Sequence, residues 1–251
     1  MPSILETIPP LSEVELLTIN SEMASRCAES LIESASYLIN WAHSRFKERV
    51  RADTSFGKDS ALIWSIVSST GSDIGFTFGD TGFLPPETHD QKDALTSLFP
   101  SNPLVVARPS DDAYKDIVDR KLWRSTEREK LDEFLETVKL HPLRMLDQAV
   151  GKVATIAAAR RDQTLDREGL DYVVSQDDGT LRIYPFLDWQ QSHVDEYIDS
   201  RGLPRNKLAL LYGIGAISHR NIVYFDGQVE VVNFDSCGRN SQNGKPVHRA
   251  D

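Results

Sequence analysis

Residues 51–60 read Arg-Ala-Asp-Thr-Ser-Phe-Gly-Lys-Asp-Ser, and this stretch decides the fold. Apolar residues alternate through its first half with the period of two that predicts a strand, at Val50, Ala52, Thr54 and Phe56. The apolar residues that follow share one face of a helix, at Leu62, Ile63, Ile66 and Val67. A tight turn therefore joins this strand to this helix.

The turn at residues 55–57 directs the backbone N–H groups of a helix start beyond the end of the strand, and Lys58 adds a positive charge. Such a corner is suited to an anion, most often a phosphate or a sulfate. An ordinary strand-to-helix turn, with Asp59 or Ser60 as the helix N-cap, explains the same residues. This stretch alone leaves both interpretations open.

Further short apolar runs alternate with helix-patterned sequence, which predicts an α/β fold with a parallel sheet covered by helices on both faces. These runs are Ile74 to Phe78, Leu104 to Ala107 and Val153 to Ala159. Ligands of such sheets bind beyond the carboxyl ends of the strands. Three polar turns fall there: Ser55 to Ser60, Gly79 to Gly82 and Arg160 to Gln163.

The second and third of these turns also allow two interpretations. The Thr81 hydroxyl and the N–H group of Gly82 can hold a ribose or a phosphate, and neighbouring Arg160 and Arg161 match a phosphate in bidentate fashion. A simple Asp80-Thr81-Gly82 turn and a solvated helix start explain them equally well as structure. Their shared position at strand ends favours ligand binding.

We expect three regions in the chain: an N-terminal helical segment over 1–46, the α/β domain over 47–220, and a hairpin with a flexible tail over 221–251. Residues 1–20 are expected to be irregular, and residues 21–46 to form one or two helices with Cys27 as a buried, inert thiol. Asp226-Gly227 between alternating apolar runs predicts a type I′ hairpin. Asp188 is expected to cap a helix that Trp189 anchors.

A formal charge of -10 argues against nucleic acid or an anionic membrane as the main partner. No apolar run is long enough to span a membrane, and the first residues lack a signal-peptide pattern, so we expect a cytoplasmic protein. Two cysteines, Cys27 and Cys237, do not make a disulfide framework or an iron–sulfur site. The six histidines show no ligand spacing, so no metal is expected.

Six segments carry a family resemblance. Ser55-Phe56-Gly57 and the segment Asp80-Thr81-Gly82-Phe83-Leu84-Pro85-Pro86-Glu87-Thr88 resemble the signature of phosphoadenylylsulfate (PAPS) reductases, in the adenine nucleotide alpha-hydrolase-like superfamily. Further matching segments follow in the family's order, at residues 121–123, 139–143, 159–164 and 183–189. The resemblance covers roughly residues 40 to 220 and implies a Rossmann-like domain that binds an adenosine phosphosulfate.

The resemblance also implies the site residues and the chemistry. The nucleotide would lie on Ser55, Phe56, Gly57, Lys58, Asp59, Ser60, Asp80, Thr81, Gly82, Arg160, Arg161 and Arg220. In the family a C-terminal cysteine, here Cys237, attacks the sulfur and forms an S-sulfonate, from which thioredoxin or glutaredoxin releases sulfite. No tightly bound cofactor is needed, and a homodimer is compatible with this reading.

Two departures from the family pattern keep alternatives open. The tail segment Asp235-Ser236-Cys237-Gly238-Arg239 lacks the family's Glu-Cys-Gly-x-His, so Cys237 is either the nucleophile or an exposed thiol. The loop ending Lys58-Asp59-Ser60 is similar to the phosphate loop of ATP pyrophosphatases, which would use Mg-ATP to adenylate a substrate in sulfur transfer or a biosynthetic pathway. A nucleotide-binding sensor without chemistry is a third hypothesis.

The number of cysteines bears on whether the substrate is adenylylsulfate or its 3′-phosphorylated form. Relatives that act on adenylylsulfate commonly carry a four-cysteine motif, which two cysteines cannot supply, so the resemblance favours the 3′-phosphorylated nucleotide. The charge for that phosphate would come from the Arg160 region, Lys139 or the tail. Gly213-Ile214-Gly215 and His219 are weaker candidates near the nucleotide, with His219 as a general acid.

Overall fold

A six-stranded sheet lies at the centre of the computed structural model, which describes residues 10–208 and 222–231. Its strand order is β3-β2-β1-β4-β6-β5, and all neighbours are parallel except β5, which runs antiparallel to β6. The strands are β1 (Val50–Thr54), β2 (Gly75–Gly79), β3 (Leu104–Ala107), β4 (Ala154–Ile156), β5 (Val173–Ser175) and β6 (Leu181–Ile183). The predicted α/β fold with a parallel sheet is confirmed, although the sequence did not reveal β5 and β6.

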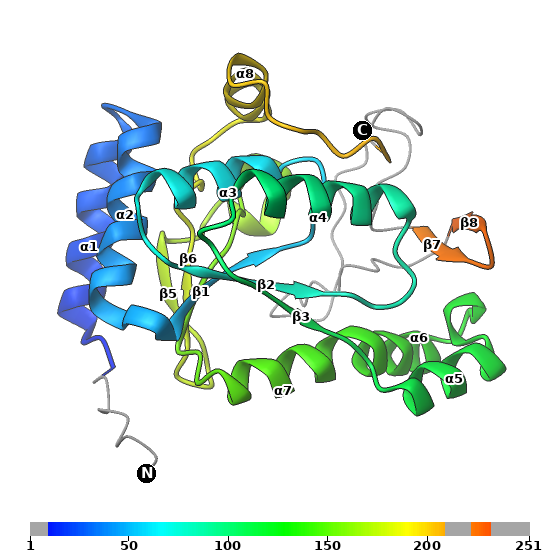
Figure 1. The fold of residues 1–251 in the computed structure, drawn as a ribbon. Helices are drawn as coiled ribbons and strands as arrows, with labels where there is room; N and C mark the ends of the chain where they lie inside the picture. Colours follow the sequence, from blue (N-terminus) through cyan, green and yellow to red (C-terminus); the bar gives the residue numbers. More distant parts are fainter. Residues whose placement is uncertain (1–9, 209–221, 232–251) are drawn as a thin grey trace, which may run out of the picture.

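Helices cover both faces of this sheet, with α3 and α4 on one side and α7 on the other (Figure 1). The chain order explains this arrangement, because β1, β2 and β3 are connected on one face and the long connection to β4 returns across the other. The helices are α1 (Glu13–Cys27), α2 (Leu31–Phe46), α3 (Ser60–Ser69), α4 (Pro86–Leu98), α5 (Asp111–Arg120), α6 (Arg128–Leu135), α7 (His141–Ala149) and α8 (Gln191–Ser200).

The N-terminal region is more helical than the sequence predicted. Residues 13–20 belong to α1, so the expectation of irregular structure up to residue 20 was wrong. The missed signal is a capping box: Glu15 N–H donates to Ser12 Oγ at 3.3 Å, and Ser12 N–H donates to Glu15 Oε2 at 2.8 Å. Cys27 packs against the core but is half-buried rather than buried.

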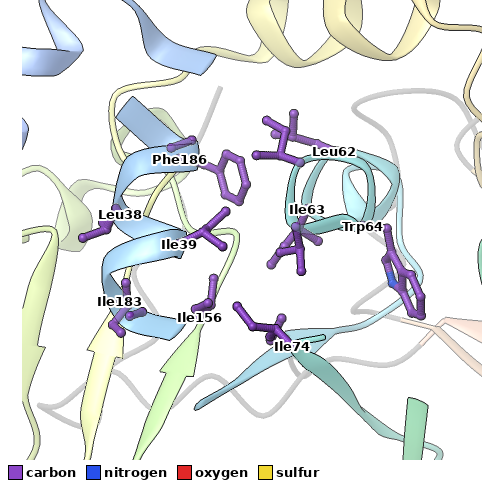
Figure 2. Close-up of a cluster of buried hydrophobic side chains, with 14 of the residues drawn as sticks. Leu38, Ile39, Leu62, Ile63, Trp64, Ile74, Ile156, Ile183 and Phe186 are labelled. Carbon is purple, nitrogen blue, oxygen red and sulfur yellow. The ribbon is translucent and has the colours of Figure 1, made fainter. Parts of the chain in front are cut away.

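One apolar cluster joins the N-terminal helices to the sheet (Figure 2). Ile39 of α2 and Ile63 of α3 face one another there, with Ile156 of β4 beside them. Trp64 stacks on Phe76 of β2 with ring centroids 3.8 Å apart. Burial of this many large side chains is the main stabilising contribution to the fold, and it fixes where β1 and α3 meet.

The opposite face of the sheet carries charged side chains next to Gly75. Arg51 of β1 donates from Nε to Thr77 Oγ1 at 3.2 Å and from Nη2 to the Phe76 carbonyl at 2.8 Å. Its guanidinium lies across Gly75, where a Cβ atom would stand 2.5 Å from Arg51 Nη2. The absence of a side chain at position 75 is therefore what lets Arg51 make these bonds.

We predict that Gly75→Ala destabilises the protein by about 1–3 kcal/mol, because the added methyl displaces a guanidinium that two hydrogen bonds hold. Gly169→Ala is the control, since no atom lies within 4 Å of a Cβ there. Denaturant unfolding measures both free energies. Equal stability of the two variants would show that Arg51 moves without cost.

Candidate functional site

The loop after β1 is held in an unusual backbone conformation by a buried aromatic ring. Phe56 has a φ of 50°, which non-glycine residues seldom adopt, and its ring packs against Phe78 and Trp64 at centroid distances of 4.8 and 5.8 Å. Its carbonyl accepts a hydrogen bond from Asn206 Nδ2 at 2.7 Å. Asn206 is a buried residue that the sequence analysis missed, because it belongs to a turn 150 residues away.

This loop leaves backbone donors free at the start of α3. Ser60 N–H donates to the Gly57 carbonyl at 3.1 Å. Within residues 10–208 and 222–231, the N–H groups of Gly57, Lys58 and Asp59 have no hydrogen-bond partner. Free N–H groups at a helix N-terminus form an anion site, since the helix dipole adds a partial positive charge.

Arg160 joins the turn after β4 to the loop after β1. It is only 2% exposed, and its Nη1 donates to Asp59 Oδ2 at 2.7 Å while its Nε donates to Asp162 Oδ1 at 3.0 Å. Asp59 occupies the N-cap position of α3, but its side chain makes no capping bond. The carboxylate is directed to Arg160 instead, so the two predicted turns do meet.

Gln191, the first residue of α8, contacts both turns. Its Oε1 accepts from Lys58 Nζ at 2.8 Å and from Arg160 Nη2 at 2.9 Å. Its Nε2 donates to Asp59 Oδ1 at 3.4 Å, and its backbone N–H donates to Asp162 Oδ2 at 2.8 Å. Nothing in the local sequence singles out this residue, because its role follows from where α8 begins.

Arg161 points to a different set of partners. It forms an ion pair with Asp188, donates to the Leu170 carbonyl at 2.8 Å and lies over the Tyr172 ring at 5.1 Å. Tyr172 also donates to Asp188, and burial raises the pKa of its hydroxyl to about 12. Arg160 and Arg161 therefore do not form a fork on one ligand in this structure.

Asp188 does not cap α8, so that prediction was wrong. Gln190 is the N-cap residue, and the Asp188 carboxylate is engaged by Arg161 and Tyr172. Asp188 has the residue type that is typical of an N-cap, but it lies two residues before the actual cap. The start of α8 is set by its tertiary contacts, such as the bond from Gln191 N–H to Asp162, and not by the local sequence. Trp189 is buried, as the sequence predicted.

The turn after β2 is ordered by its own side chains. The buried Asp80 accepts from Gly82 N–H through Oδ1 at 3.2 Å and from Arg108 Nε through Oδ2 at 3.0 Å. Thr81 Oγ1 accepts from Phe83 N–H at 3.2 Å. The Tyr114 ring covers Gly82, where a Cβ atom would be only 2.6 Å from Tyr114 Cε2.

The predicted C-terminal hairpin packs beside this turn. It consists of β7 (Ile222–Phe225) and β8 (Gln228–Val231), with positive φ angles at both central residues, as a type I′ turn requires. Tyr224 N–H donates to the Phe83 carbonyl at 2.9 Å, and Trp123 Nε1 donates to Glu230 Oε2 at 3.2 Å. Figure 1 shows the hairpin beyond the end of β2, near the start of α4.

Two predicted site residues, Arg220 and Cys237, lie outside the described residues, as do Gly213, Gly215 and His219. Across the described ranges, no group of three or more His, Cys, Asp or Glu side chains is arranged to hold a metal ion. In the same part of the chain, every helix is too short or too polar to cross a membrane.

A mostly parallel sheet with polar turns at its carboxyl edge defines a Rossmann-like α/β protein. The model of the phosphoadenosine phosphosulfate reductase domain matches residues 49–215. The chain therefore belongs to this family, which confirms the resemblance seen in the sequence. The match ends before the β7–β8 hairpin begins.

Individual relatives agree with this assignment. A phosphoadenosine 5′-phosphosulfate reductase of Synechocystis is 29% identical and covers 77% of this chain and 75% of its own length. The Vibrio vulnificus enzyme of the same name is 30% identical, over 79% of this chain and 77% of its own.

Solved structures show the same fold. The phosphate complex of a PAPS reductase from Candida auris has a TM-score of 0.67 at 22% identity, and covers 81% of this chain and 93% of its own. The FMN adenylyltransferase of Candida glabrata has a TM-score of 0.52 at 14% identity, and covers 82% of this chain and 69% of its own. At these identities the two structures support the fold alone.

We predict that Gly82→Ala destabilises the protein by about 1–3 kcal/mol more than Gly179→Ala, because only at position 82 does the methyl collide with the Tyr114 ring. Both glycines have a φ of +78°, so the backbone strain is matched. Thermal or denaturant unfolding compares the two. Equal losses would mean that the strain of the backbone alone makes Gly82 necessary.

We also predict that Arg160→Gln costs about 3–5 kcal/mol of stability, because it leaves the Asp59 carboxylate without its buried counter-charge. Adding Asp59→Asn should restore part of that loss. Arg128→Gln breaks an exposed pair with Asp132 and should cost less than about 1 kcal/mol. Strictly additive losses in the double variant would contradict the coupling of Asp59 and Arg160.

Proposed function

We propose that this protein is a sulfonucleotide reductase that converts 3′-phosphoadenosine 5′-phosphosulfate to sulfite and adenosine 3′,5′-bisphosphate. The observation that carries the proposal is the anion corner at the carboxyl end of β1. The N–H groups of Gly57, Lys58 and Asp59, which have no partner within residues 10–208 and 222–231, lie at the start of α3, in a chain of the phosphoadenosine phosphosulfate reductase family.

The site residues divide into two roles in this proposal. The loop at 55–60 receives the 5′-phosphosulfate through backbone N–H groups and Lys58, while the turn at 80–82 borders the nucleoside. Arg160 supports the loop through Asp59, because its side chain is almost fully enclosed. Arg161 and Arg220 remain proposed phosphate contacts from the family resemblance.

The chemistry of the proposal uses Cys237 as the nucleophile. Its thiolate attacks the sulfur of the sulfonucleotide, so that an S–S bond forms, the S–O bond to phosphate breaks and adenosine 3′,5′-bisphosphate leaves. A dithiol protein of the thioredoxin or glutaredoxin type then attacks Cys237 Sγ and releases sulfite as a mixed disulfide forms. Its second thiol frees Cys237, so the dithiol supplies both electrons.

Reduction is favoured over ATP pyrophosphatase chemistry by the family and by the names of the relatives. The geometry of the loop is consistent with this choice, because Asp59 is engaged by Arg160. A dithiol donor also requires a reducing compartment, which supports the proposal of a cytoplasmic protein. The homodimer stays a prediction.

We predict that Cys237→Ser abolishes thioredoxin-dependent sulfite formation and leaves the binding of adenosine 3′,5′-bisphosphate unchanged, because serine is a far weaker nucleophile. Cys27→Ser is the matched control, since Cys27 belongs to α1 and packs against the apolar core, and it should retain full turnover. Sulfite release and calorimetric binding are measured on both variants. Turnover that survives Cys237→Ser would remove this thiol from the mechanism.

A further inference from the structure

The cationic side chains around the anion corner differ in whether the described residues supply them with an ion-pair partner. Arg160 is paired with Asp59 and Asp162, and Arg205 is paired with Asp195 at 2.8 Å. Lys58 differs, because it forms no ion pair with any residue in the described part of the chain. Among the described residues, its ammonium group donates only to the neutral amide oxygen of Gln191, at 2.8 Å.

The amide of Gln191 is itself fixed from several sides. Its oxygen also accepts from Arg160 Nη2 at 2.9 Å, and its nitrogen donates to Asp195 Oδ1 at 3.2 Å. With its backbone N–H bonded to Asp162, the side chain has little freedom to turn away from Lys58. A residue locked in this way holds its partner in one place and limits the side-chain entropy that a lysine loses on binding.

We propose that Gln191 is a positioning residue for the nucleotide: it holds the Lys58 ammonium at the anion corner without cancelling its charge. The inference rests on the proposed function, since it assumes a phosphate or sulfate group on this loop. A carboxylate at position 191 would form an ion pair with Lys58 and supply internally the counter-charge that the ligand otherwise provides. An amide orients the cation and leaves its charge for the ligand.

The experiment is a double-mutant cycle on the full-length protein, with adenosine 3′,5′-bisphosphate as the probe and calorimetry as the readout. Gln191→Ala should weaken binding about fivefold, because Lys58 loses its support. In a Lys58→Met background the same change should have no effect on the dissociation constant. A role of Gln191 in stability alone predicts the same loss in both backgrounds, and that result would overturn the proposal.

Gln191→Glu provides a second measurement that does not depend on loss of structure. It keeps the acceptor for Lys58 and Arg160, yet it should weaken binding more than Gln191→Ala and flatten the salt dependence of the affinity. Binding equal to wild type would contradict the inference. Thermal unfolding of each variant, with and without the nucleotide, confirms that the folded state is being compared.

Gln190→Ala is the matched control, because it changes the N-cap residue of α8 without touching Lys58 or Arg160. Its affinity should equal that of wild type, and a loss as large as that of Gln191→Ala would assign the effect to the helix start and overturn the proposal. The experiment distinguishes a failure of the proposed function from a failure of the positioning role of Gln191. A wild-type protein that does not bind the bisphosphate contradicts the proposed function, whereas binding that is insensitive to Gln191 contradicts only the positioning role.

Discussion

The buried ion pair between Asp59 and Arg160 is the constraint on which the site depends. It joins the loop after β1 to the turn after β4, two strands that are neighbours in the sheet but about 100 residues apart in the chain. Charges that are withdrawn from water must be satisfied by partners, and Arg160 has three. Because the carboxylate of Asp59 is bound to Arg160, it does not cap α3, and the N–H groups of Gly57, Lys58 and Asp59, which have no partner among the described residues, are left for an outside anion.

Aromatic packing in the core also holds the loop after β1 in place. Phe56 sits in the loop itself, and its ring lies between Phe78 of β2 and Trp64 of α3, so the positive φ angle is maintained by burial. Trp64 in turn donates to Thr54 Oγ1 at 3.2 Å and closes the end of β1. The loop is therefore positioned by the core, and the shape of the anion corner does not require a ligand to form it.

The β7–β8 hairpin packs against the turn after β2. It lies beyond the part of the chain that the family model matches, and a second aromatic cluster with Phe83 and Trp123 fixes it beside the turn after β2. Phe83 of this cluster is also the last residue of the Asp80-Thr81-Gly82-Phe83 segment. The chain that leads to Cys237 thus leaves from a hairpin docked next to a predicted nucleotide-binding turn.

The sequence by itself determined the strands β1 to β4, the turns after β1, β2 and β4, the hairpin and the family, because periodicity, turn residues and motif order are local properties. It did not determine β5 and β6, which have three residues each and, unlike β4, do not lie within a longer apolar run, or the helix from Glu13, which depends on a capping box. Only the tertiary structure decided the partners at the site. Arg160 and Arg161 are adjacent in sequence but serve different networks, and Gln191 and Asn206 act across more than 100 residues, because hydrogen-bond partners are chosen by where elements pack.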